Sequence, residues 1–527
     1  MNQILLNNQG TPVEEIVNDI ESILRNVSQP DLGAKEYNPC QPDAGINGIN
    51  DPISPVTQGI QEVKVILQNQ GSGNLSSAII NWKVNGTLQK PYAWTGNLAV
   101  RENEEVGIGS FDFKSGKSSI QAWTSKPNGL DECNLYNDST FSELAGALCG
   151  TYTVGGSGAD FATFSEAVSV LNTAGISCPV IFKVRNGMYN EQFVIKAIQG
   201  SSPTNTVTFQ SESGDSTKVV VQYGGWPNIT VQLKNAGYIN FRGIGINGYQ
   251  GLIFAERTHH INVEHCNLMG DNQVLGINTG SHDIKISSSV LFGAEYAISL
   301  DNAKDIQIWD NVLNEQTGRA IYGSSSRNIV IEENRFNKIQ TGVVLHYCIN
   351  SVIRNNRFNI LTQPGRENTG VYLSYSDSLS ACNNYINTVG NTPGIGMKMD
   401  NSSHTGIYFN SLNIANTDIG QQSQGLWMQT GDQNNIKNNI FNIKTVGTPV
   451  LIMPGTTGFS LDYNDYYSPS GLIGQYADIN YKDLQVWRQT TGQDSHSLSE
   501  NPFYTSITNF RHPRPISDNQ HNMEQLS

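Results

Sequence analysis

From residue 236 onward, apolar and polar positions follow one recurring pattern, apolar-x-x-Asn-x-apolar. Asn stands at the central position in seven of nine copies. The occupants, 22–29 residues apart, are Cys266, Ser289, Asn311, Asn334, Asn356, Asn384, Asn410, Asn439 and Asn464. The positions three before and two after the centre are apolar in all nine copies. A unit of this length with two or three short strands cannot bury its own apolar face, so successive units must stack.

Stacking pairs each strand with its counterpart in the next coil, about 4.8 Å away. The recurring Asn then lies inside, where its amide bonds the amides of the coils above and below. The pattern therefore predicts an all-β fold, a right-handed parallel β-helix over residues 149–500. A leucine-rich repeat would require Leu-x-x-Leu-x-Leu, which this chain lacks.

The β-helix is expected to begin with a capping helix. A helical pattern opens at Ala159 and places Phe161, Phe164 and Leu171 on one face. Cys149 and Cys178 bracket this helix, and we predict a disulfide between them, with two buried free thiols as the alternative.

The last coil also needs a cover, because an open coil is an unpaired sheet edge. We predict a short helix from Lys482 to Gln489 that covers it with Trp487. Asp462 and Asp465 precede this helix, and we expect them to cap turns, with calcium binding as the alternative. No other cofactor is expected.

Residues 41–140 are predicted to form an Ig-like β-sandwich that precedes the β-helix. Polar and apolar residues alternate over 61–67 and 80–84, as in half-buried strands. Asn85-Gly86 directly after the second stretch is a strong hairpin signal. Several short strands separated by turns are typical of a sandwich.

Composition narrows the function. The 527 residues carry a net charge of −14, which argues against nucleic acid as a partner. Charged residues make up only 15% of the chain, and Gly and Asn are frequent, as expected for a β-rich extracellular or cell-surface protein. No stretch is long and apolar enough for membrane insertion, and the N-terminus lacks the features of a signal peptide.

Two segments resemble a known family. Gly150 to Phe164, and then Gly187, Tyr189 and Glu191 in a Gly-x-Tyr-x-Glu pattern, resemble the opening of pectate-lyase-like β-helix proteins. Trp487 to Ser497 is similar to the end of large secreted β-helix proteins of the Bacteroidetes type. The 41–140 block resembles the CARDB modules that accompany them. The resemblance implies a secreted or cell-surface β-helix protein.

The ends of the chain carry motifs that such proteins place after their coils. Residues 1–38 contain Gly10-Thr11-Pro12 and Pro30-Asp31-Leu32-Gly33-Ala34, and resemble the tail of a preceding β-helix unit. Residues 501–527 are expected to be a C-terminal tail from a truncated unit. The chain would then be one slice of a longer repeating protein, with a genuine start as the alternative.

Enzymatic signatures of this fold class are largely missing. The motifs of pectin methylesterases, the calcium cluster of pectate lyases and most polygalacturonase motifs are not found. Only Asn416-Thr417-Asp418 matches the last group, and a lone tripeptide is weak. Because proteins of this fold have several different activities, the fold alone does not identify the activity of this chain.

Counting back from the central position of each copy identifies side chains that point outward and lie above one another in successive coils, which we call a column. The position twelve before carries Tyr322, Tyr372, Lys398 and Trp427, among others, and Ile452 in the last copy. Aromatic faces beside polar groups suit sugar rings. We therefore predict a glycan-binding face, with an ordinary solvated sheet as the favoured alternative. The predicted glycan-binding residues are Tyr322, Tyr372, Trp427 and Asp301.

Two further groups are weaker candidates. Lys398, His346 and Asp400 are the best available trio for a lyase, although His346 and Asp400 lie two coils apart. His259 and His282 are stacked in adjacent coils and could bind a metal ion, but solvated turn residues are the favoured alternative.

The sequence thus favours a secreted polysaccharide-binding or adhesin-type protein whose partner is a polysaccharide or cell-surface glycan. The alternative is a polysaccharide lyase or glycoside hydrolase that acts on acidic glycans. A phage tailspike is a third hypothesis, which would require tight trimers. The sequence does not determine the oligomeric state.

Overall fold

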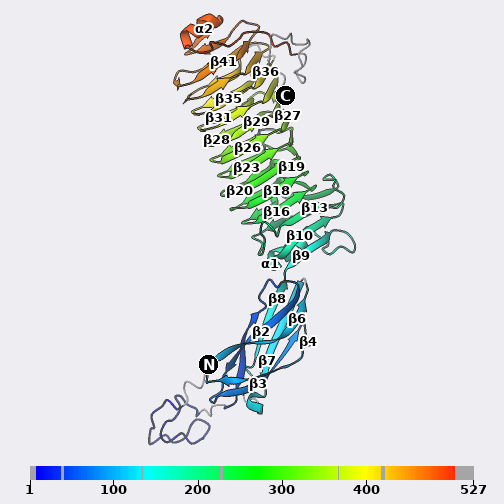
Figure 1. Cartoon of the computed structure of the whole chain (residues 1–527), viewed down its shortest axis with the longest axis vertical. Coiled ribbons are helices and arrows are strands. Elements are labelled where there is room, and N and C mark those ends of the chain that lie inside the picture. The colour runs from blue at the N-terminus through cyan, green and yellow to red at the C-terminus, as the bar shows by residue number, and fades with distance from the viewer. Residues whose placement is uncertain are drawn as a thin grey trace. The chain divides into compact units, whose positions relative to one another are not determined.

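The structure, a computed structural model, describes residues 8–36, 41–114, 116–131, 134–225, 229–365, 367–416 and 422–504. The chain forms two compact units (Figure 1). One comprises Met1–Gly150 with Thr173–Pro179, and the other comprises Thr151–Asn172 with Val180–Ser527. Within the described ranges, no helix has the length and apolar character needed to cross a membrane.

The first unit contains a β-sandwich. One sheet has the order β1-β2-β6; the other has the order β4-β3-β7-β8, with β5 paired to β3. These strands are β1 (Ala44–Asp51), β2 (Gly59–Asn69), β3 (Leu75–Val84), β4 (Thr87–Leu88), β5 (Tyr92–Leu98), β6 (Asn103–Phe113), β7 (Gly116–Ser125) and β8 (Ser139–Gly146), and a 3-10 turn spans Pro127–Gly129. Asn85 and Gly86 form the β3–β4 hairpin with φ of 49° and 79°. The sandwich extends past residue 140, because β8 pairs with β7 as far as Gly146.

The core of the sandwich comes from alternating residues of facing strands. Val63, Val65 and Leu67 of β2 are fully buried, as is Ile80 of β3. The side chains between them are more exposed, so each strand buries one face, as the alternation predicts. Residues 8–36 of the same unit form a loop segment, in which Asp19 accepts hydrogen bonds from the backbone N–H groups of Glu21, Ile23 and Glu36.

Two buried carboxylates make the stability of this sandwich depend on pH. The Oδ1 atoms of Asp43 and Asp138 have no hydrogen-bond partner among the described residues. Burial, with the nearby Asp43 carboxylate, raises the pKa of Asp138 to about 6. The folded state therefore holds this proton more tightly than the unfolded state, whose Asp ionises near 3.8. The stabilising contribution is complete below that lower pKa and is lost as the pH rises through about 6.

We expect Asp138→Asn to be more stable than the parent above pH 6 and to match it below pH 4. The expected gain is a rise of about 2–4 °C in the melting temperature at neutral pH. Thermal unfolding of the full chain across this pH range measures it. Asp112→Asn, at an exposed carboxylate of β6, is the control that should leave the pH profile unchanged. Equal profiles for parent and Asp138→Asn would contradict the prediction.

The second unit is a right-handed parallel β-helix, as the repeat predicts. Its 13-stranded sheet consists of β9 (Leu148–Val154), β10 (Ile176–Val184), β13 (Val207–Ser211), β16 (Gly237–Arg242), β18 (His259–Glu264), β20 (His282–Ser287), β23 (Lys304–Trp309), β26 (Arg327–Glu332), β29 (Val352–Arg354), β32 (Ser380–Cys382), β35 (Gly406–Tyr408), β39 (Asn435–Lys437) and β43 (Ser460–Asp462). Neighbouring coil strands pair in parallel, for example β23 with β26.

The second sheet has 23 strands and supplies the outer surface described below. They are β11 (Gly187–Asn190), β12 (Phe193–Ile195), β14 (Val219–Tyr223), β15 (Ile229–Lys234), β17 (Gly245–Ala255), β19 (Asn267–Ile277), β21 (Val290–Gly293), β22 (Tyr296–Asp301), β24 (Val312–Asn314), β25 (Arg319–Ser324), β27 (Arg335–Ile339), β28 (Thr341–His346), β30 (Arg357–Thr362), β31 (Thr369–Ser374), β33 (Tyr385–Gly390), β34 (Ile395–Asp400), β36 (Ser411–Asn416), β37 (Ser423–Met428), β40 (Ile440–Ile443), β41 (Gly447–Ile452), β44 (Asp465–Tyr467), β45 (Gly474–Tyr476) and β46 (Ile479–Tyr481). A separate small pair joins β38 (Gly431–Asp432) to β42 (Thr456–Thr457).

The recurring Asn forms the predicted inner ladder. Asn356 donates through Nδ2 to the carbonyls of Ile331 and Arg354 and to Oδ1 of Asn384. Its own Oδ1 accepts from the backbone N and from Nδ2 of Asn334, both at 3.0 Å. The same contacts continue along the axis, so the ladder closes each coil and fixes its register on the next.

The start of the β-helix is capped by α1 (Phe164–Ala174), which begins later than the sequence pattern predicts. Asp160 accepts hydrogen bonds from N and Oγ1 of Thr153, which holds this residue in a turn. Glu191 accepts from the backbone N–H groups of Phe164 and Ser165 and so caps the helix. The Gly-x-Tyr-x-Glu resemblance therefore ends in a residue that caps this helix.

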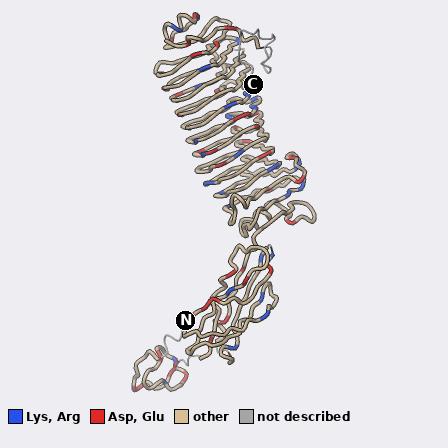
Figure 2. Tube along the Cα trace, viewed as in Figure 1, with Lys and Arg blue, Asp and Glu red and all other residues tan. Residues whose placement is uncertain are grey.

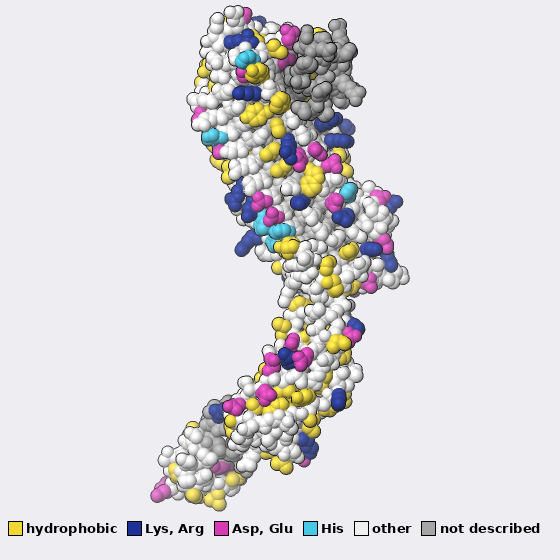
Figure 3. Space-filling model, in the orientation of Figure 1, with side chains coloured by type: hydrophobic (Ala, Val, Ile, Leu, Met, Phe, Trp, Pro, Cys, Tyr) yellow, Lys and Arg dark blue, Asp and Glu magenta, His cyan; other side chains and the backbone are white. Residues whose placement is uncertain are grey.

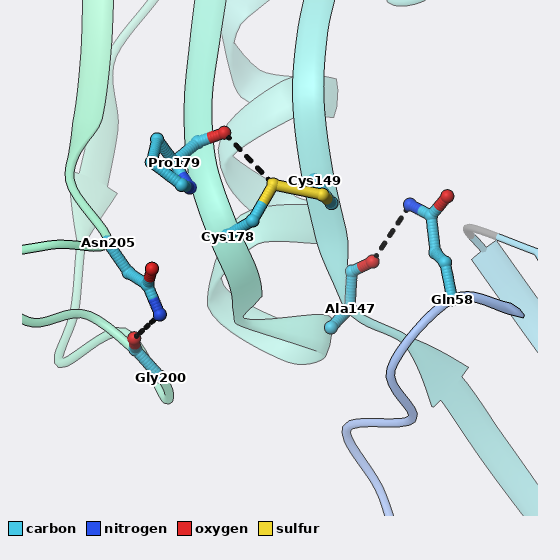
Figure 4. Close-up of a disulfide and its surroundings, with 7 residues drawn as sticks. All are labelled: Gln58, Ala147, Cys149, Cys178, Pro179, Gly200 and Asn205. Carbon is cyan, nitrogen blue, oxygen red and sulfur yellow. Dashed lines mark hydrogen bonds between the residues drawn. A yellow bond between two sulfur atoms is a disulfide. The ribbon is translucent and has the colours of Figure 1, made fainter.

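A disulfide joins Cys149 to Cys178, the two residues that bracket α1 (Figure 4). Nearby, Gln58 donates through Nε2 to the carbonyl of Ala147 at 3.1 Å. Three further cysteines, Cys266, Cys348 and Cys382, are free thiols.

The far end is covered by α2 (Leu484–Thr491), which Asp483 caps through hydrogen bonds to the N–H groups of Gln485 and Val486. Trp487 is fully buried, as the sequence predicts, and donates through Nε1 to the buried Asp494 at 2.7 Å. Asp462 accepts a hydrogen bond from the backbone N–H of His496, and Asp465 accepts one from that of Glu500, so both carboxylates tie the last coil to the segment that follows α2.

Candidate functional site

The predicted aromatic column lies in register on the second sheet. Ser299, Tyr322, Val344, Tyr372, Lys398 and Trp427 pair one coil after another. The last position is Leu451 and not Ile452, which the sequence count selects. The turn that follows β41, closed by a hydrogen bond from Thr456 N to Met453 O, takes one residue more than the other coils. Ile452 therefore faces the core.

Lys398 occupies the space between two of the predicted aromatic rings. Its Nζ lies 4.5 Å from the ring centroid of Tyr372 and 4.7 Å from that of Trp427. It also forms an ion pair of 2.7 Å with Glu367. The indole Nε1 of Trp427 is buried and has no hydrogen-bond partner among the described residues. A ligand that stacks on these rings must displace the lysine or lie over it.

The other predicted members of this face are more scattered. Tyr322 contacts Tyr296 and lies under the guanidinium of Arg319, 5.3 Å from its ring centroid. Val344, which is buried, separates Tyr322 from Tyr372 along the column. Asp301 is exposed one coil before Ser324, at the end of its strand.

The predicted catalytic trio makes no direct mutual contact in the hydrogen bonds of the described chain. Nδ1 of His346 lies 3.2 Å from Oγ of Ser374, and Asp400 accepts from Oγ1 of Thr430 at 3.1 Å. Ser374 stands between His346 and Asp400 in the column, and Lys398 is paired with Glu367. Their use as a catalytic group stays a prediction.

A cleft that the sequence count did not identify lies in the early coils. It has a volume of about 580 Å³ and opens to solvent. Its lining is Asn190, Gln222, Tyr223, Gly224, Gly225, Asn247, Gly248, Tyr249 and Asp271. The amides lie in register, and Gln222 donates to Asn190 at 2.7 Å. The cleft therefore presents a line of amides with two phenols and one carboxylate beside it.

The same register continues along the axis as an outer amide column. From Asn190, Gln222 and Asn247 it passes through Met269 and Phe292 to Asn314, Asn337 and Asn359. Asn337 donates to Asn314 at 3.0 Å. The outer amides lie three residues after the inner Asn in these coils, but Met269 and Phe292 occupy the same register in two others, so the repeat marks only the inner ladder.

Two arginines stand beside this column. Arg335 and Arg357 pair in register on β27 and β30, and both are exposed. Neither arginine has an ion-pair partner among the described residues. Charged residues are sparse along the coils (Figure 2). Their strands are neighbours, about 4.8 Å apart, so an anion that lies between the two like-charged guanidinium groups would be favourable.

The histidine candidates lie together on the first sheet. The rings of His259 and His282 stack with centroids 5.3 Å apart. His260, His282 and Asp283 each offer one ligand atom, and these atoms lie within 4.8 Å of one another. Figure 3 shows histidine side chains gathered beside acidic ones on this face. Of the two predicted residues, His282 belongs to this trio, and His259 packs against it.

Comparisons with known proteins agree with the fold. Residues 231–447 match the family model described as periplasmic copper-binding protein (NosD), a span that includes these histidines. No curated protein sequence matches the chain.

Solved structures similar to parts of the chain include the CARDB domain of a Pyrococcus furiosus protein, with 22% identity, 21% of this chain and 95% of that chain covered, and a TM-score of 0.17. The surface adhesin PfbA of Streptococcus pneumoniae shares 12% identity over 60% of this chain and 88% of its own, with a TM-score of 0.44. The mannuronan C-5 epimerase A-module of Azotobacter vinelandii shares 12% over 64% and 92%, with a TM-score of 0.43. The fold assignment rests on the strand pairing of this chain itself. The Bacteroidetes type stays a prediction.

Proposed function

We propose that this protein is exported and binds a polysaccharide along the outer face of its β-helix, as an adhesin-type recognition protein. The observation that carries the proposal is the cleft at Gln222, Tyr223, Asn247 and Asp271, which continues into the outer amide column. The column offers amides in two groups, Asn190 to Asn247 and Asn314 to Asn359, with the apolar Met269 and Phe292 between them, to a chain that lies along the axis at a rise of about 4.8 Å per coil.

The chemistry of the cleft suits sugars. Amide and carboxylate groups exchange hydrogen bonds with hydroxyls, and the faces of Tyr223 and Tyr249 offer apolar surface to the C–H side of a ring. The unpaired Arg335 and Arg357 beside the column favour a glycan that carries carboxylate or sulfate groups. The partner class is therefore an acidic polysaccharide.

Binding fits this lining better than hydrolysis. A glycosidase generally uses two carboxylates that flank the scissile bond. The described lining of the cleft has one, Asp271, among neutral amides and phenols. The predicted face at Tyr322, Tyr372, Trp427 and Asp301 is a second place for the same ligand, in which Lys398 would contribute charge.

The test is a panel of neutral and uronate-containing polysaccharides, read for binding and for new reducing ends or unsaturated products. We expect binding without turnover. Tyr223→Ala should weaken it by about tenfold, which corresponds to about 1.4 kcal/mol. Tyr136→Ala, at a fully exposed tyrosine of the first unit, is the control and should bind as the parent does.

Two further arms separate the alternatives. The double variant Arg335→Gln, Arg357→Gln should lose affinity for acidic polysaccharides and keep it for neutral ones. Trp427→Ala tests the predicted aromatic face and should weaken binding less than Tyr223→Ala. Products that disappear in Lys398→Ala or His346→Ala would instead establish an enzyme. Equal binding by the parent and Tyr223→Ala would overturn the assignment of the cleft.

A further inference from the structure

Two dipeptides from consecutive coils meet on the surface of the 13-stranded sheet. His259-His260 begins β18, and His282-Asp283 begins β20 one coil later. Parallel pairing places His259 opposite His282. His260 and Asp283 share the left-handed backbone conformation, with φ of 52° and 54°, and so project at equivalent positions of successive turns. The β-helix thereby brings four metal-ligating side chains into one group.

Hydrogen bonds within this group orient the rings. His282 Nδ1 lies 2.6 Å from Oδ2 of Asp283, so these two atoms face the same point, where an ion that replaces the shared proton would bind both. Nδ1 of His259 lies 2.9 Å from Nδ1 of His260. In the tautomer where His260 donates to His259, Nε2 of His260 keeps its lone pair, 3.9 Å from Oδ2 of Asp283.

The coil before the group is shaped around these rings. Gly237 pairs with His259, and a Cβ at Gly237 would lie 2.2 Å from Cε1 of that ring. Tyr238 packs on His260 with ring centroids 4.6 Å apart. The rings are therefore held on one side by the preceding coil and face the next histidine and carboxylate on the other.

We propose that His260, His282 and Asp283 bind one divalent transition-metal ion, with His259 as the positioning residue that orients His260. Two imidazoles and a carboxylate are ligands that suit Zn²⁺ and Cu²⁺. Bonds of about 2.0–2.2 Å require ligand atoms about 3.4 Å apart, so the 3.9 Å between His260 Nε2 and Asp283 Oδ2 must close by about 0.5 Å, and the 2.6 Å between His282 Nδ1 and Asp283 Oδ2 must open by about 0.8 Å. These side chains are partly exposed, so small rotations can make both changes.

The next coil places one cation beside the group. Lys304 follows His282 in the column, but it lies 3.9 Å from Asp305 and is drawn toward that carboxylate.

Calorimetric titration of the metal-free full chain with Zn²⁺, and separately with Cu²⁺, tests the site. We expect one ion per chain, with Cu²⁺ tighter than Zn²⁺. His282→Ala and Asp283→Ala should each weaken binding by at least about tenfold, since each removes a ligand. Electron paramagnetic resonance of the Cu²⁺ form should show coupling to two nitrogens in the parent and to one in His282→Ala.

The matched control is His404→Ala. His404 is also exposed and hydrogen-bonded to a carboxylate, Asp377 at 2.6 Å, but has no second histidine beside it in the described chain. It should bind the ion as the parent does. Circular dichroism confirms that each variant is folded, and polysaccharide binding by His282→Ala should be unchanged. Equal affinity for parent and His282→Ala, or no one-to-one binding by the parent, would overturn the proposal.

Discussion

Replacing Asn356 by alanine should lower the free energy of unfolding by about 3–6 kcal/mol. The amide makes five hydrogen bonds inside the β-helix, three as donor and two as acceptor. Its removal leaves the backbone N–H of Asn334 and the carbonyls of Ile331 and Arg354 buried without this partner. Each such group costs about 1–3 kcal/mol when water cannot replace the lost bond. Urea unfolding, followed by circular dichroism, measures the effect.

Asn337→Ala is the matched control. Asn337 lies on the outer face of β27, one coil before Asn356, is partly exposed and donates one side-chain bond, to Asn314. Because water can solvate Asn314 in its absence, we expect a loss below about 1 kcal/mol. A similar loss for the two variants would show that the inner ladder contributes no more than an outer amide, and would contradict this account of the fold.

Trp487→Ala should open the last coils of the β-helix. Trp487 is fully buried, and its removal takes away a large apolar side chain at a cost of about 3–5 kcal/mol. It also leaves the buried carboxylate of Asp494 without the indole donor. In a stacked-coil protein each coil is stabilised by its neighbours, so the loss should be felt first at β43 and β44. Hydrogen exchange at these strands should accelerate while the middle coils stay protected.

Val486→Ala, at the preceding residue of the same helix, is the control. Val486 is 47% exposed, so its truncation should change exchange at β43 and β44 little. If both variants leave exchange unchanged, α2 is not a cap. If Trp487→Ala accelerates exchange equally in all coils, the β-helix unfolds as one unit and not from its end.

The β-helix could be predicted from the sequence because the repeat that specifies it is a short local pattern. Each inner Asn carries apolar neighbours at fixed offsets, so the pattern identifies the turn and both flanking strands in every coil. Trp487 was predictable for a similar reason, since one large aromatic residue follows the last repeat in a short helical pattern. The start of α1 was predicted too early because Phe161 fits the helical face, whereas Asp160 holds its segment in a turn.

The outer surface depended on the tertiary structure, because coil lengths vary and one residue changes which side chains are neighbours. The extra residue after β41 moves Ile452 into the core and places Leu451 beside Trp427. The cleft is formed by residues from four strands in successive coils, and no motif in the sequence joins these residues. The space between Tyr372 and Trp427 is filled by Lys398, which only three-dimensional distances reveal.

The sequence by itself therefore determined the coil, its inner ladder and its end caps, since burial repeats the same requirement in every coil. The tertiary structure decided which outward amides, arginines and histidines lie together, since packing does not require the same residue type at an outward position in every coil. The histidine group shows both contributions. The 23-residue spacing already stacks His259 on His282, whereas the approach of His260 Nε2 to Asp283 Oδ2, at 3.9 Å, comes from the fold of the two turns.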